Sequence, residues 1–152
     1  MPSNPVTADA APVIVSGNGQ GRYQQAVHIG KHHLLVDEPV SLGGDDAAPA
    51  PTDFLLAALG ACTSITLQMY AERKQMPLTG VQVALTLDKI EKADGGKMDR
   101  ISRKITLDGE LTDAQRAALL AIANKCPVHR LLQSDIRIDS ELVDAGGLSS
   151  AV

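Results

Sequence analysis

The chain has 152 residues and a formal net charge of -4, which suits one domain with a sizeable core and gives no electrostatic reason to expect a nucleic-acid partner. Its aromatic residues are two tyrosines and one phenylalanine, so we expect an aliphatic core. The N-terminal residues lack a basic segment followed by an apolar one, so we expect no secretory signal and a cytoplasmic location. One domain at 12–143 is expected, with flexible tails at 1–11 and 144–152.

The first third of the chain predicts three short strands followed by a loop. Residues 13–17 favour a strand, and 22–29 and 32–36 favour two more, because β-branched and apolar residues dominate them. The dipeptide Gly30-Lys31 has the length of a two-residue hairpin turn. Glycine, proline and aspartate are concentrated in 37–51, which predicts a loop.

A central helix is predicted from Pro51 to about Gln75, with Thr52 as its N-cap and Asp53 in its first turn. Residues 54–67 carry no charge and place apolar or small side chains in every direction, which is typical of a helix buried on all sides. The uncharged run is shorter than the roughly 20 residues that cross a membrane. We therefore predict the core helix of a soluble protein, with no membrane partner.

Strict alternation in the second half predicts a hairpin. Apolar residues recur at every second position over 81–88, and the return strand over 100–108 repeats the pattern, with Arg103 interrupting its apolar face. The residues between them, 93–97, have the composition of a tight turn. The two segments therefore predict an antiparallel pair.

The rest of the chain predicts a helix, a short second helix and a last strand. Thr112 opens a capping box, and the helix that follows ends near Lys125. Cys126 precedes a proline, which disfavours a helical conformation at that residue and starts a new helix over 128–132. Alternation over 136–142 predicts the last strand. The element order indicates an α+β fold of strands around a buried helix.

The two cysteines are the candidate reactive groups. Cys62 lies about three turns into the central helix, too far for the helix dipole to activate it, and burial among aliphatic side chains raises a thiol pKa. Taken alone it is best interpreted as a small buried hydrophobe, and reactivity requires a cation from elsewhere in the fold. Cys126, at a helix break, is expected to be exposed. If the two meet, the chemistry is that of a peroxidatic pair: a sulfenic acid captured as a disulfide.

A metal site is the competing interpretation. Cys126 and His129 have the spacing of two ligands, and Cys62 or the pair His32-His33 could complete the set. No Cys-x-x-Cys occurs, however, and structural zinc usually takes four ligands in tighter pairs, so we expect no metal.

Three stretches resemble the OsmC/Ohr family of thiol-dependent hydroperoxide reductases. They are the helix segment 55–63, its continuation 69–74, and Cys-Pro-Val-His-Arg at 126–130. Their order and the strand pattern agree over residues 12–143, and the branch most similar is that of OsmC-like proteins with Cys-Pro-Val-His. The resemblance implies an intertwined homodimer in which strands of each subunit complete the other's sheet.

The resemblance also implies the chemistry. Active sites would lie at the dimer interface, with Cys62 as the peroxidatic and Cys126 as the resolving residue. Substrates would be organic hydroperoxides, with a dithiol reductant and no metal or flavin. The apolar substrate pocket is expected to include Phe54 and Leu55. The alternative function is a binding module that holds a small apolar or thiol-bearing ligand in the same fold.

One position departs from the better-studied branches, which pair a glutamate with an N-terminal arginine to hold the thiolate. The matching position here is Thr52, which carries no charge. Its neighbour Asp53 points about 100° away around the helix, so it is only a weak substitute. Arg22 is the candidate arginine, although it could also be an ordinary charge at a strand edge.

Overall fold

The computed structural model describes residues 11–144 and 146. The chain divides into two compact units, one of residues 1–54 with 137–152 and the other of residues 55–136, and each is described by itself. The predicted tails, 1–11 and 144–152, lie almost entirely outside the described residues.

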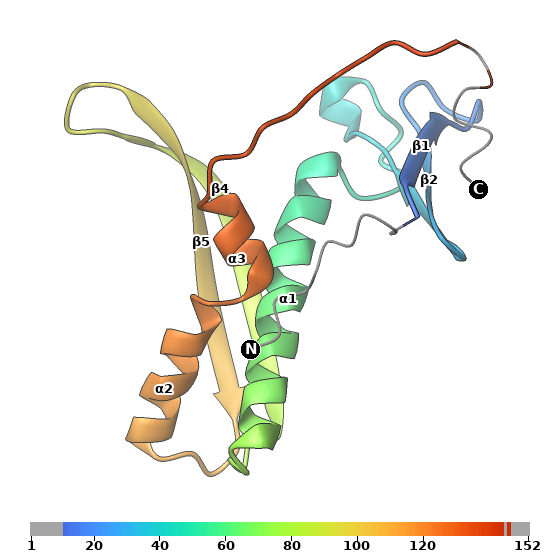
Figure 1. Cartoon of the computed structure of the whole chain (residues 1–152). Coiled ribbons are helices and arrows are strands. Elements are labelled where there is room, and N and C mark those ends of the chain that lie inside the picture. Colours follow the sequence, from blue (N-terminus) through green and yellow to red (C-terminus); the bar gives the residue numbers. More distant parts are fainter. Residues whose placement is uncertain (1–10, 145, 147–152) are drawn as a thin grey trace. The chain divides into compact units, whose positions relative to one another are not determined.

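The first unit contains a three-stranded antiparallel sheet in the order β1-β2-β3 (Figure 1). Its strands are β1 (Val13–Gly17), β2 (Gln25–Ile29) and β3 (His32–Val36), which confirms the three predicted strands, although β2 begins three residues later than expected. Gly30 adopts φ 56°, a left-handed conformation that a two-residue hairpin turn requires.

A buried carboxylate fixes the loop that follows β3. Asp37 accepts backbone N–H bonds from Glu38 at 2.8 Å, Asp45 at 3.1 Å and Ala47 at 3.0 Å. The bond from Ala47 is the main reason that the pKa of Asp37 lies below its ordinary value. The loop contains one short 3-10 helix, η1 (Val40–Leu42), and is otherwise irregular, as its composition predicts.

Helix α1 spans Pro51–Arg73. The expectation that Thr52 is the N-cap is wrong, because the helix already begins at Pro51, whose fixed φ suits a first helical position. The carboxylate of Asp53 instead accepts the N–H of Ala50 at 2.9 Å and so satisfies the helix start. Gln75, with φ 53°, follows the helix end, close to the predicted boundary.

One face of α1 is buried and the other is exposed, so the prediction of burial on all sides is wrong for a single chain. The exposed side includes Ile65 at 51% and Met69 at 59% exposure. By length and composition α1 could cross a membrane, a property that it shares with core helices of soluble proteins. Its buried residues recur every three or four positions and are Leu59, Gly60, Thr63, Thr66, Leu67 and Ala71.

The second unit packs α1 against a long hairpin and a second helix (Figure 1). The hairpin pairs β4 (Gly80–Glu91) with β5 (Lys97–Asp108), and α2 (Asp113–Ala123) and α3 (Pro127–Leu132) follow. These elements confirm the predicted hairpin, capping box and short helix. Their core is aliphatic and consists of Leu67, Ala71, Leu119 and Ala123, with partly buried neighbours from β4 and β5.

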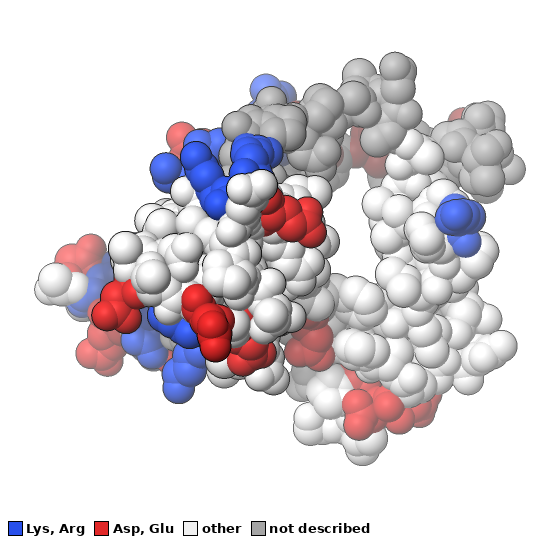
Figure 2. Space-filling view, turned by 90° about the horizontal axis from the view of Figure 1, so that it is seen from below, with Lys and Arg blue, Asp and Glu red and all other residues white. Residues whose placement is uncertain are grey.

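Charges of both signs pair across the two strands of this hairpin. Lys89 pairs with Asp99 and Arg100 with Asp88, in each case across the two strands. In the left part of Figure 2, basic and acidic side chains are intermixed. That part of the surface therefore presents no patch of a single sign to a charged polymer.

The predicted last strand at 136–142 is wrong. The structure has no strand there, and Ile138 and Leu142 are 84% and 103% exposed. The alternating pattern is present, but within the described residues no neighbouring strand offers this segment a ladder of hydrogen bonds.

Replacing the core residue Leu119 tests the packing of the second unit. Leu119 is fully buried between α1 and the hairpin, whereas its neighbour Leu120 is 59% exposed. We expect Leu119→Ala to lower the free energy of unfolding by about 2–5 kcal/mol and Leu120→Ala by less than about 1 kcal/mol. Urea denaturation with unchanged m-value measures both, and equal losses would contradict this core assignment.

Candidate functional site

The second unit brings the two cysteines together. Cys62 and Thr63 lie on α1, and Cys126 occupies the N-cap position of α3. The Cys126 sulfur is 3.8 Å from Thr63 Oγ1, and the charge of Cys126 acts on the ionisation of Cys62. Two thiols distant in sequence therefore share one site.

Cys126 is fully buried, so the expectation that the helix break exposes it is wrong. The break occurs where predicted, with Cys126 extended at ψ 145° and Pro127 in the first helical position. The side chain, however, turns inward and accepts the N–H of His129 at 3.3 Å, as an N-cap does. The sulfur thus faces α1 and not the solvent.

Cys62 is half-buried, and its thiol is not activated within the second unit. Burial is the main reason that the pKa of Cys62 lies above its ordinary value. The backbone N–H of Val128 acts in the opposite direction, as does the hydroxyl of Thr66, whereas a negative charge on Cys126 raises the pKa further. Only one thiolate is therefore favoured at a time.

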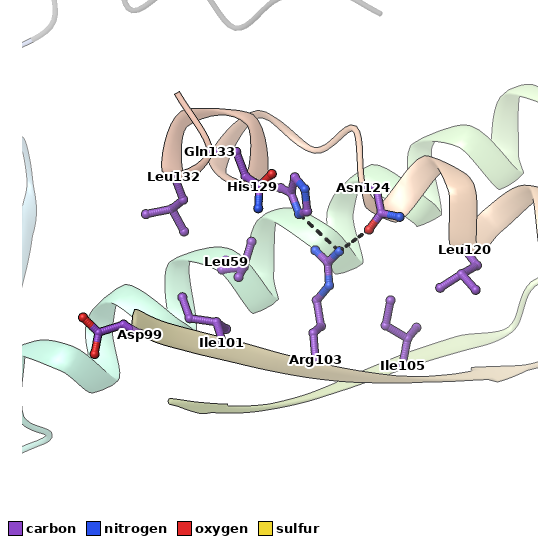
Figure 3. Close-up of a pocket in the computed structure, with 10 residues that line it drawn as sticks. All are labelled: Leu59, Asp99, Ile101, Arg103, Ile105, Leu120, Asn124, His129, Leu132 and Gln133. Atoms are coloured by element: carbon purple, nitrogen blue, oxygen red, sulfur yellow. Dashed lines mark hydrogen bonds between the residues drawn. The ribbon is translucent and has the colours of Figure 1, made fainter. Parts of the chain in front are cut away.

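Arg103 of β5 holds the site together (Figure 3). Its Nη1 donates to Thr63 Oγ1 at 2.8 Å and to the carbonyl of Ala123 at 3.3 Å. Its Nη2 donates to Asn124 Oδ1 at 2.8 Å and to His129 Nδ1 at 3.4 Å. One guanidinium thus joins β5 to α1, to the end of α2 and to α3.

His129 is held in its neutral form. Burial is the main reason that the pKa of His129 lies below its ordinary value, and the charge of Arg103 adds to the effect. Because arginine can only donate hydrogen bonds, Nδ1 must accept, which leaves the ring proton on Nε2.

A cavity of about 380 Å³ lies beside this cluster, within the second unit. Arg103, Asn124 and His129 form its polar wall, and Figure 3 shows Ile101, Arg103 and Ile105 projecting from β5 toward it. The remaining lining residues are Leu59, Asp99, Leu120, Leu132 and Gln133.

The other predicted site residues belong to the first unit, except Leu55. Arg22 is exposed and stacks on Tyr23, with its guanidinium carbon 5.0 Å from the ring centre. Asp53 is engaged at the helix start, and Phe54 lines an apolar cavity of about 360 Å³ with residues of the sheet. Leu55, the first residue of the second unit, is 42% exposed.

A metal set at Cys126 and His129 is not assembled among the described residues, where no three potential ligands of the His, Cys, Asp and Glu types come together. His129 Nδ1 faces Arg103, a repulsive neighbour for a cation.

Arg103 is the site residue that the sequence interpretation missed. Its signal was present, because it is the one charge that interrupts the apolar face of the strand formed by Ile101, Ile105 and Leu107. A charge placed on a core face requires partners, and such charges mark candidate sites. The sequence did not show that those partners are Thr63, Asn124 and His129.

Comparison with known proteins gives a consistent family. A profile described as OsmC-like protein matches residues 43–141. An OsmC-like protein from Mycoplasma pneumoniae has a TM-score of 0.68 at 17% identity, over 84% of this chain and 89% of the other. An organic hydroperoxide resistance protein OsmC from Legionella pneumophila has a TM-score of 0.60 at 20% identity, over 80% of this chain and 89% of the other. An organic hydroperoxide resistance protein from Elizabethkingia anophelis has a TM-score of 0.62 at 18% identity, over 86% of this chain and 92% of the other. A search of curated proteins finds no match.

The neutral His129 predicts a loss of stability on acidification. Because the pKa of His129 is lowered in the folded chain, the unfolded chain binds the proton at higher pH, and stability falls as pH decreases below about 6.5. We expect His129→Gln to reduce the difference in melting temperature between about pH 7.5 and pH 5.5. Thermal unfolding at both pH values measures it. An unchanged difference would mean that His129 is not held neutral.

Proposed function

Because the chain belongs to the OsmC-like family, we propose that it is a thiol-dependent reductase of organic hydroperoxides. The observation that carries the proposal is the shared site of Cys62 and Cys126 within one unit. The similarity to organic hydroperoxide resistance proteins supports a role in redox stress and indicates the substrate class.

The reaction has two steps. The Cys62 thiolate attacks the O–O bond of the hydroperoxide, forms an S–O bond and releases an alkoxide, which takes a proton to become an alcohol. The Cys126 thiolate then attacks the sulfur of the Cys62 sulfenic acid, and the S–O bond breaks as hydroxide leaves and is protonated to water. An external dithiol reduces the resulting disulfide and restores both thiols.

The first step requires a cation near Cys62, because burial raises the pKa of that thiol. We assign this role to Arg22, whose guanidinium is exposed in the first unit and, among the described residues, forms no ion pair. Asp53 is a weaker candidate for orienting Arg22, since its carboxylate is engaged at the start of α1.

We further propose that two copies assemble through the exposed side of α1. Ile65 and Met69 are large apolar residues left in solvent on a helix whose other face is a core, and a second copy of this chain would cover them. The apolar cavity at Phe54 and the exposed Leu55 would then form the substrate pocket. Sedimentation of a single-chain mass would contradict this assembly.

A cytoplasmic location fits the proposed cycle, because two free thiols that must be regenerated by a dithiol persist in a reducing compartment. No cofactor is needed for either step, since the hydroperoxide supplies the oxidant and the dithiol the reductant.

A second candidate is a binding module for a small apolar or thiol-bearing ligand with little peroxidase activity. The raised pKa of Cys62 favours it, because a protonated thiol is a weak nucleophile. The pH dependence of the alkylation rate of Cys62, measured in the assembled protein, separates the two functions. A midpoint pH above that of free cysteine supports the binding module, and a midpoint pH below it supports the reductase.

Stoichiometric oxidation tests the reductase directly. One equivalent of cumene hydroperoxide is expected to convert the reduced protein to a form with a Cys62–Cys126 disulfide, detected by mass spectrometry of the intact chain and of its linked peptides. Cys62→Ser should abolish peroxide consumption. Cys126→Ser should allow the first step and accumulate sulfenic or over-oxidised Cys62.

Arg100→Met is a suitable control, because Arg100 pairs with Asp88 on the exposed surface of the hairpin and lines no part of the site cavity. It is expected to form the disulfide at the same rate as the parent protein. Peroxide consumption that survives loss of Cys62 would refute the proposal.

A further inference from the structure

We propose that Arg103 is a positioning residue that acts through Thr63 to prepare Cys126 as a thiolate for the resolving step. This inference rests on the proposed two-cysteine reaction and adds a role that the sequence did not indicate. Its basis is a half-buried guanidinium bound to the same hydroxyl that contacts the buried sulfur.

The guanidinium is fixed in place by neutral groups. The four N–H donors on Nη1 and Nη2 face Thr63, Ala123, Asn124 and His129, and this leaves only the Nε donor for any ligand. Among the described residues no carboxylate forms an ion pair with Arg103. A charge held beside a core without a counter-ion is stabilised by any anion that forms nearby.

The acidic group in contact with this network is the Cys126 thiol. Its sulfur already accepts the N–H of His129 at 3.3 Å and lies 3.8 Å from the Thr63 hydroxyl. The contact with the His129 N–H favours a thiolate, since a negatively charged sulfur is the stronger acceptor. The structure therefore places a backbone donor on this sulfur, and a positive charge stands one hydroxyl away.

Thr63 can serve both protonation states of the sulfur. Its hydroxyl donates to the carbonyl of Leu59 at 2.7 Å, so in the thiol form the sulfur is the donor to Thr63 Oγ1. The carbonyl of Leu59 is also the regular helical acceptor for the N–H of Thr63. The hydroxyl proton can therefore turn to a Cys126 thiolate without leaving that carbonyl unpaired, while Arg103 keeps its bond to the oxygen.

The charges that face Cys126 agree with this assignment. From α1 comes Cys62, whose own ionisation is disfavoured while Cys126 is charged, and from α3 comes the neutral ring of His129. From β5 comes Arg103, the one positive charge of the network. Once Cys62 has become a neutral sulfenic acid it no longer competes for negative charge, and Cys126 is free to ionise and attack.

The step balances without a further reactant. The Cys126 thiolate forms an S–S bond with the sulfenic sulfur of Cys62, the S–O bond breaks, and hydroxide leaves with a solvent proton as water. Sulfur at Cys62 has been oxidised by the hydroperoxide beforehand. In the reverse direction, Arg103 favours Cys126 as the leaving thiolate when a dithiol reduces the disulfide.

The first test follows the rate of disulfide formation after peroxide addition as a function of pH. We expect Arg103→Met to slow resolution of the Cys62 sulfenic acid about tenfold near neutral pH, with the half-maximal rate of this step moved up by about one pH unit. Arg103→Lys should recover most of the rate. Thr63→Val should act like Arg103→Met, and Thr63→Ser should resemble the parent protein.

The matched control is Arg100→Met, which removes an arginine from the same strand where it pairs with Asp88 on the exposed surface. It should leave the pH profile unchanged. Equal slowing in Arg100→Met and Arg103→Met, or an Arg103→Met profile that keeps its midpoint, would overturn the inference.

A second test needs no peroxidase activity. In Cys62→Ser, Cys126 is the sole cysteine of the chain, and its thiolate absorbs in the ultraviolet without any reagent reaching it. Adding Arg103→Met should raise the midpoint of this absorbance change by about one pH unit, and adding Arg100→Met should not. If the midpoint shifts in the Cys62→Ser background but the parent protein reduces no peroxide, the proposed function alone is refuted. A midpoint that does not shift refutes this inference.

Discussion

The hydrogen bonds of Arg103 are the constraint on which the site depends. A guanidinium placed on the apolar face of β5 must satisfy its donors, and it does so on three other elements: Thr63 of α1, Asn124 at the end of α2 and His129 of α3. Because α3 begins at Cys126, the same bonds fix the buried sulfur against α1. One set of contacts therefore positions α3 and both parts of the site in the second unit.

Much of this architecture follows from local sequence signals. The hairpin at Gly30, the alternation of β4 and the capping box at Thr112 are each set by a few neighbouring residues, and all were predicted. The Cys-Pro pair placed the start of α3 correctly, because proline restricts the residue before it. The central helix was also predicted, but its cap was assigned to Thr52 and not to the contact of Asp53 with Ala50.

The errors arise where the outcome depends on distant partners. Periodicity over residues 136–142 favoured a strand, but a strand requires a neighbour, and Ile138 and Leu142 are exposed instead. The burial of Cys126 depends on Thr63, which is remote in sequence, so no local pattern could reveal it. Arg103 was visible as an interruption of an apolar face, yet its role depends on four acceptors from other elements.

The site divides its electrostatics between the two thiols. Burial opposes ionisation of Cys62, and a charge on Cys126 opposes it further, while the Cys126 sulfur accepts the N–H of His129. Such an arrangement suits sequential chemistry, in which one sulfur is consumed before the other ionises.

Equilibration in a glutathione redox buffer, without peroxide, tests most directly whether the two sulfurs share one site. The account predicts that the folded protein forms an intramolecular Cys62–Cys126 disulfide, seen as linked peptides and as loss of both thiols together. Formation of separate glutathione adducts on Cys62 and Cys126, or oxidation only after unfolding, would contradict it.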